Sequence, residues 1–169
     1  FHPGLDVPKF MAIAETANAV GIPYGGHVSL GVGLETCLQN GYKSVEHMDG
    51  YLEAMIADKS RLDPTIAGPF SMLLVNEANE NKLSELIEMT LKNKTWIAPT
   101  LTLFDRYFGF VPADSFRLAP EMKYLPGLQI QQWVQQKKLL ENQGVLTESN
   151  VQPFLDFRNQ LFLSLHQAG

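Results

Sequence analysis

Ile22-Pro23-Tyr24-Gly25-Gly26-His27 is a short apolar stretch that lies between two helical patterns. The stretch Lys43-Ser44-Val45-Glu46-His47 follows the second of these patterns and also ends in a histidine. Short apolar segments that alternate with helices are typical of strands in a buried parallel sheet. We therefore predict two neighbouring parallel strands, each with a histidine at its carboxyl end.

Predicted helices alternate with these strands. Asp6 is suited to cap a helix that ends at Gly21, and further helices are predicted over residues 30–39 and 79–92. The first helix is expected to bury a stripe of apolar residues: Phe10, Ile13, Ala14, Ala17 and Val20. A third strand is predicted over residues 95–101. Three successive helix-then-strand units predict an α/β fold with a parallel sheet.

The chain changes character after Leu103. An aromatic and proline-bearing connection leads to a Gln-rich helix over residues 129–142 and a longer helix over residues 148–167. We interpret residues 104–145 as an insertion within a single domain that covers residues 1–169. Helical spacing of its apolar residues argues against low complexity.

Composition excludes several classes of protein. The chain is 45% hydrophobic and 18% charged, which is typical of a globular domain. It has 13 Lys and Arg against 18 Asp and Glu, and the basic residues are scattered, so we expect neither nucleic acid nor a membrane surface as a partner. Apolar stretches such as residues 66–75 are far shorter than the roughly 20 residues of a membrane span. A small-molecule substrate is the expected partner.

Cys37 is the only cysteine, which excludes an internal disulfide and favours a reducing compartment such as the cytoplasm, although the sequence does not fix the localisation. On a helix face with Leu34 and Leu38, it is expected to be a buried small hydrophobe. The chain starts without a signal peptide, on a loop-like His2-Pro3-Gly4. We therefore expect it to be an internal piece of a longer protein.

His27 and His47 are the candidate metal ligands. The carboxyl ends of the strands carry the catalytic groups in parallel α/β barrels, and neutral imidazole is a common zinc ligand. On spacing alone, a histidine at the end of a strand is more often a hydrogen-bonded structural residue than a metal ligand. A catalytic zinc also needs about three protein ligands, so this pair is incomplete by itself.

The sequence around the histidines resembles that of the amidohydrolase superfamily, with the imidazolonepropionase-like and prolidase-like enzymes as the nearest subgroup. The resemblance rests on residues 21–28, on residues 34–50 with their Ser44-Val45-Glu46-His47 ending, and on Trp96-Ile97-Ala98-Pro99-Thr100-Leu101. It covers residues 5–103 well and 146–169 loosely. It implies a partial TIM (β/α)8 barrel, about strands five to seven with their helices, plus a helical insertion.

The resemblance also implies roles for both histidines. His27 and His47 would ligate the second of two divalent metal ions, with zinc as the expected metal, or His27 would bind a single ion with His47 near the activated water. The family's His-x-His, its bridging lysine or glutamate and its catalytic aspartate have no counterpart here. The parent protein is expected to hydrolyse an amide or another C–N bond of a small substrate, and the isolated fragment is expected to be inactive. A one-metal deaminase and a non-catalytic structural or binding fragment are the alternatives.

Three further residues are candidates for substrate binding. Asp49 and Tyr51 follow His47 in a loop over the expected barrel mouth, where they would touch substrate or orient a ligand. Thr100 ends the third strand, where packing explains its presence almost as well. Glu46 is expected to face the helices, because side chains alternate along a strand. An open half-barrel exposes its sheet, so we also predict a homo-oligomer formed through that surface.

Overall fold

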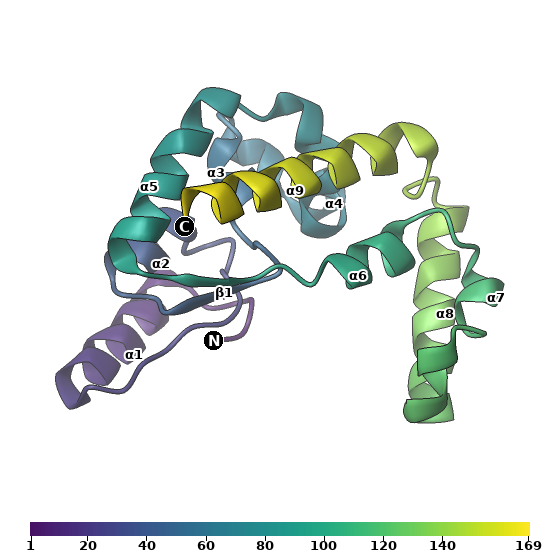
Figure 1. Cartoon of the computed structure of the whole chain (residues 1–169), viewed down its shortest axis with the longest axis horizontal. Coiled ribbons are helices and arrows are strands. Elements are labelled where there is room, and N and C mark those ends of the chain that lie inside the picture. Colours follow the sequence, from purple (N-terminus) through teal and green to yellow (C-terminus); the bar gives the residue numbers. More distant parts are fainter. The chain divides into compact units, whose positions relative to one another are not determined.

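The computed structural model describes residues 1–169 and shows a mixed α/β chain in which helices predominate (Figure 1). Its two strands are β1 (Ser44–Glu46) and β2 (Trp96–Ala98). The α-helices are α1 (Val7–Val20), α2 (Leu34–Gln39), α3 (Tyr51–Met55), α4 (Pro64–Ala67), α5 (Leu83–Asn93), α6 (Leu101–Leu103), α7 (Ala113–Phe116), α8 (Gly127–Asn142) and α9 (Glu148–Ala168). Tighter or wider turns are η1 (Lys59–Leu62), η2 (Pro69–Glu77), η3 (Glu80–Lys82), η4 (Phe104–Phe108) and η5 (Pro120–Tyr124). None of the helices combines the length and apolar character that crossing a membrane requires.

The chain divides into two compact units. The first consists of Phe1–Thr100 with Asn159–Gly169, and the second of Leu101–Arg158. Helix α9 begins in the second unit and ends in the first. The predicted insertion, residues 104–145, lies entirely within the second unit. The second unit extends beyond the insertion at both ends, because it also includes α6 and the start of α9.

Parallel backbone pairing organises the first unit. Strands β1 and β2 are parallel, with Val45 opposite Ile97. On the other side of β1, the amide of Gly26 donates to the carbonyl of Ser44 at 3.0 Å, and the amide of Glu46 donates to the carbonyl of Gly26 at 3.0 Å. The segment around Gly26, β1 and β2 therefore pair in the order in which they follow one another in the sequence.

The predicted strand over residues 22–27 is shorter in the structure than expected. Only Gly26 forms a bridge, parallel to Val45. Pro23 has no amide hydrogen to donate, and Gly26 has φ of 128°, a conformation outside the β region. Gly25 is required for a different reason, because a Cβ atom there would lie 2.3 Å from Oγ of Ser44.

Glu46 does not face the helices, contrary to the expectation from alternation. Val45 is the buried residue of β1, with no exposed surface, whereas Ser44 and Glu46 are partly exposed. Through the strand register they share a face of the sheet with Trp96, whose side chain is 80% exposed. We call the face that carries Ser44, Glu46, Trp96 and Ala98 the open face. Alternation fails after Glu46 because His47 has φ of 57°, so the strand ends there.

Helix α1 begins as predicted, with the Asp6 carboxylate accepting from the amide of Lys9, and ends at Gly21 in the left-handed conformation. Phe10 and Ala14 are buried, and Phe10 packs with the rings of Phe1 and Tyr42. The prediction that Ile13 and Val20 face inward is wrong. These side chains are 45% and 62% exposed, because only the narrow stripe through Phe10 and Ala14 meets the rest of the first unit.

A buried lysine holds the second unit together. Helix α7 packs against α8, with Phe116 and Val134 in a shared core. Lys137 of α8 has no exposed surface, and its ammonium donates to the carbonyl oxygens of Arg106, Tyr107 and Gly109 at 3.0, 2.7 and 2.9 Å. All three ammonium hydrogens therefore have acceptors. Burial lowers the pKa of Lys137, and these hydrogen bonds offset the cost of placing the charge there.

We predict that Lys137→Met destabilises the chain by about 2–4 kcal/mol, because three buried carbonyl groups lose their donor. Chemical denaturation monitored by circular dichroism measures the change. The neighbouring Lys138 is a matched control, since its ion pair with Asp114 lies on the surface, and Lys138→Met should cost about 0–1 kcal/mol. Equal effects of the two substitutions would contradict the anchoring role of Lys137.

Candidate metal and substrate site

The structure brings His27 and His47 together. Their ring centroids lie 4.9 Å apart and the ring planes are inclined by 33°. The pairing of Gly26 with Val45 places both histidines directly after two neighbouring parallel segments. The two imidazoles therefore share one end of the sheet, as the sequence predicts for groups at the carboxyl ends of parallel strands.

Asp49 orients the ring of His27. Its Oδ2 atom lies 2.8 Å from Nδ1 of His27, and only 11% of the Asp49 side chain is exposed. An ionised carboxylate only accepts hydrogen bonds, so Nδ1 carries the hydrogen and Nε2 of a neutral ring holds the lone pair. The backbone of His27 is also fixed, because the hydroxyl of Tyr42 donates to its carbonyl oxygen at 2.7 Å. This carboxylate–imidazole arrangement is the one that commonly supports metal-binding histidines.

Thr100 contacts the ring of His47. Its Oγ1 atom lies 2.5 Å from Nδ1 of His47, and the amide of His47 donates to the carbonyl of Ala98 at 2.8 Å. His47, Met48 and Thr100 all have positive φ, at 57°, 56° and 45°, which side chains other than glycine seldom adopt. Such backbone conformations concentrate at functional sites.

Tyr51 lies in the core and does not line the pocket described below. Its side chain has no exposed surface, and its hydroxyl is 2.5 Å from Oγ1 of Thr90 on α5. Burial raises the pKa of Tyr51 to about 12, so the phenol stays neutral. Packing of α3 against α5 accounts for this residue, and its substrate contact stays a prediction from the sequence.

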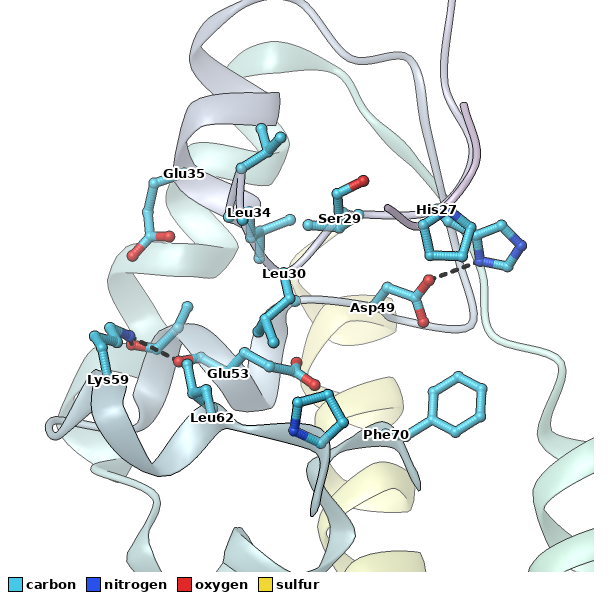
Figure 2. Close-up of a pocket in the computed structure, with 18 of the residues that line it drawn as sticks. His27, Ser29, Leu30, Leu34, Glu35, Asp49, Glu53, Lys59, Leu62 and Phe70 are labelled. Atoms are coloured by element: carbon cyan, nitrogen blue, oxygen red, sulfur yellow. Dashed lines mark hydrogen bonds and ion pairs between the residues drawn. The ribbon is translucent and has the colours of Figure 1, made fainter. Parts of the chain in front are cut away.

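His27 lines a pocket of about 890 Å³ (Figure 2). His27 and Asp49 lie at one end of it, and Phe70 lies nearby. Apolar side chains form much of its wall: Val28, Leu30, Val32, Leu34, Leu62, Pro64 and Pro69. Pockets of this size with apolar walls and a few polar groups are typical of small-molecule sites.

Sequence reasoning missed Glu53, Lys59 and Phe70 among the residues of the pocket. A signal for Glu53 was present, because Tyr51, Leu52, Ala54 and Met55 make α3 apolar around its whole circumference. A charged residue within such a helix cannot reach bulk solvent easily. Lys59 and Phe70 follow in irregular segments that have no periodic pattern to read.

The other candidates have structural surroundings. His2 is exposed, with its ring centroid 6.4 Å from that of His27 and its Nδ1 2.8 Å from the carbonyl of Pro3. Cys37 is buried, and burial raises the pKa of its thiol to about 12, which suits the predicted role of a small hydrophobe.

The residues present fit part of a metal site. Two imidazoles lie close enough to approach a common ion, and one is held by a carboxylate. No group of three or more His, Cys, Asp or Glu side chains in the structure is arranged to hold a metal ion. The pair therefore fits as part of a ligand set.

Comparison with protein-family models, with curated proteins and with solved structures gave no match. The amidohydrolase resemblance therefore remains a prediction from the sequence.

We predict that the Nδ1–H tautomer of His27 depends on Asp49. In Asp49→Ala the ring loses its acceptor, and the fraction with hydrogen on Nε2 should rise. Long-range ¹H–¹⁵N correlation spectra distinguish the two tautomers. The spectrum of His166, on α9, serves as the internal control and should not change. An unchanged His27 spectrum would show that the carboxylate does not set the tautomer.

Proposed function

We propose that this chain is part of the catalytic domain of a metal-dependent amidohydrolase that cleaves an amide or another C–N bond of a small substrate. One observation carries the proposal: the imidazoles of His27 and His47 lie 4.9 Å apart beside a pocket lined by His27. Asp49 holds the first ring and Thr100 contacts the second. Such hydrogen bonds orient imidazole ligands before a metal arrives.

The order of the backbone pairing supports a partial (β/α)8 barrel as the fold of this domain. Phe1 adds a fourth parallel segment, because its amino group donates to the carbonyl of Gly25 at 2.6 Å and its carbonyl accepts from the amide of His27 at 3.3 Å. The four segments thus pair in sequence order, and helices lie between each two in the chain. Sequential parallel segments joined through helices are the repeating unit of such barrels.

His27 and His47 would supply two ligands to one or two divalent ions, with zinc as the proposed metal. A zinc ion in such a site lowers the pKa of bound water and polarises the substrate carbonyl. The residues of this chain would hold the ligands in place and line the pocket. Asp49, which lines the pocket, and Thr100, which contacts the ring of His47, are the proposed substrate contacts. The remaining ligands would come from segments outside these residues.

We predict that the chain binds Zn²⁺ through both histidines. His27→Ala and His47→Ala should each weaken binding by at least the roughly tenfold that loss of a hydrogen-bonding partner costs a metal site. Competition with a chromophoric chelator measures the affinity, and His166→Ala is the matched control. In the complete protein, the same two substitutions should abolish zinc-dependent hydrolysis of dipeptides or cyclic amides. Unchanged affinity in both variants would overturn the proposal.

We also propose that the open face of the sheet mediates self-association. The indole of Trp96 is 80% exposed, which is unusual for such a large apolar side chain. Trp96→Glu should shift the chain toward the monomer in sedimentation equilibrium. Tyr124→Glu is the control, because Tyr124 is 78% exposed but does not belong to the sheet. A monomeric unaltered chain at all concentrations would contradict this proposal.

A further inference from the structure

Glu53 places a carboxylate in the wall of the pocket. It lies on the short helix α3, and Figure 2 shows its side chain reaching from that helix toward the side of Asp49 and Phe70. The hydroxyl of Ser71 donates to Oε1 at 2.7 Å and is its one side-chain hydrogen-bond partner. Burial is the main reason that the pKa of Glu53 is raised, which means that this carboxylate lacks solvation.

No cation of the protein forms an ion pair with Glu53. Lys59 is the one basic side chain that lines the pocket, apart from the imidazole of His27. Its ammonium donates instead to the backbone carbonyls of Glu53 and Ala54, at 2.7 and 3.2 Å. In Figure 2 the carboxylate of Glu53 points away from Lys59. The acidic group therefore lies in the pocket without an ion-pair partner.

The remaining charges favour a cationic guest. Besides Glu53, the carboxylates of Glu35, Asp49 and Asp63 line the pocket, against the single ammonium of Lys59. The walls between them are apolar, including Leu30, which lies near Glu53 in Figure 2. A poorly solvated carboxylate without an ion-pair partner is stabilised by an ammonium group, whereas an anionic guest would be repelled.

We propose that the pocket binds small molecules that carry a primary ammonium group next to an aliphatic or aromatic body, with Glu53 as the residue that recognises the ammonium. The ammonium would take the place of solvent at the carboxylate, and the apolar body would contact Leu30, Leu34 and Leu62. As a statement about the substrate this inference rests on the proposed hydrolase function, but the binding itself requires no metal.

Isothermal titration calorimetry of the 169-residue chain in EDTA tests the proposal. The probes are 2-phenylethylamine, its neutral N-acetyl derivative and the anion 3-phenylpropanoate, which share the same ring and differ in charge. A charge-assisted hydrogen bond in a buried site corresponds to a preference of about tenfold or more for the amine over the neutral probe. We expect the anion to bind weakest of the three.

Substitution of Glu53 assigns the preference to one residue. In Glu53→Gln the amide oxygen still accepts from Ser71, while the preference for the amine over the N-acetyl probe should fall to about twofold or less. Glu85→Gln makes the same change in net charge at an exposed position outside the pocket and should leave the preference intact. Thermal unfolding of each variant confirms that it is folded.

Equal affinity for the amine and the neutral probe, no binding of either, or a preference that survives Glu53→Gln would each overturn the proposal. The three-probe comparison on the unaltered chain decides the matter even if Glu53→Gln fails to fold. Because no metal is present, the outcome is also separate from that of the zinc titration. Amine binding without zinc binding would uphold this inference and contradict the hydrolase.

Discussion

The parallel pairing of a few very short backbone segments decides where every functional group of the first unit lies. The bridge between Gly26 and Val45 sets His27 beside His47, and the pairing of β1 with β2 brings Thr100 to the same end. Only a few interstrand hydrogen bonds do this, and the packing of the rings of Phe1, Phe10 and Tyr42 against one another adds support. The site inherits its geometry from that pairing.

Much of this arrangement was predictable because it follows from local patterns. The cap at Asp6, the stop at Gly21 and the histidines that close two apolar segments are all visible in the sequence. A parallel sheet then dictates that the carboxyl ends lie together. Periodicity does not show how much of the apolar face of a helix other elements cover. Ile13 and Val20 have helical spacing and are nevertheless exposed.

One part of the site that the sequence does not predict is the turn after β1. His47 and Met48 adopt left-handed backbone conformations, so the alternation that was used to place Glu46 relative to His47 does not apply. Asp49 is turned toward His27, whereas Tyr51 is turned into the core against Thr90. Sequence alone gives no reason for a left-handed histidine. Glu53 was missed although the rest of α3 is apolar, and its partner, Ser71, lies in an irregular segment 18 residues away.

The pocket contains two different polar groups, an imidazole at one end and a carboxylate in its wall. At one end lies the imidazole of His27, held by a carboxylate, and in the wall lies Glu53, whose side-chain partner is a hydroxyl. A hydrolase that acts beside an amino group needs both, one to hold the reacting centre and the other to hold the substrate. The second unit, with Lys137 capping three carbonyls, is stabilised separately.

The central claim is that two imidazoles can bind one ion together. Electron spin-echo envelope modulation of Cu²⁺ added to the chain counts the imidazoles coordinated to the ion. The account predicts combination lines from two imidazoles, which His47→Ala reduces to the pattern of one. A spectrum of a single imidazole in the unaltered chain, or one that His47→Ala leaves unchanged, would contradict it.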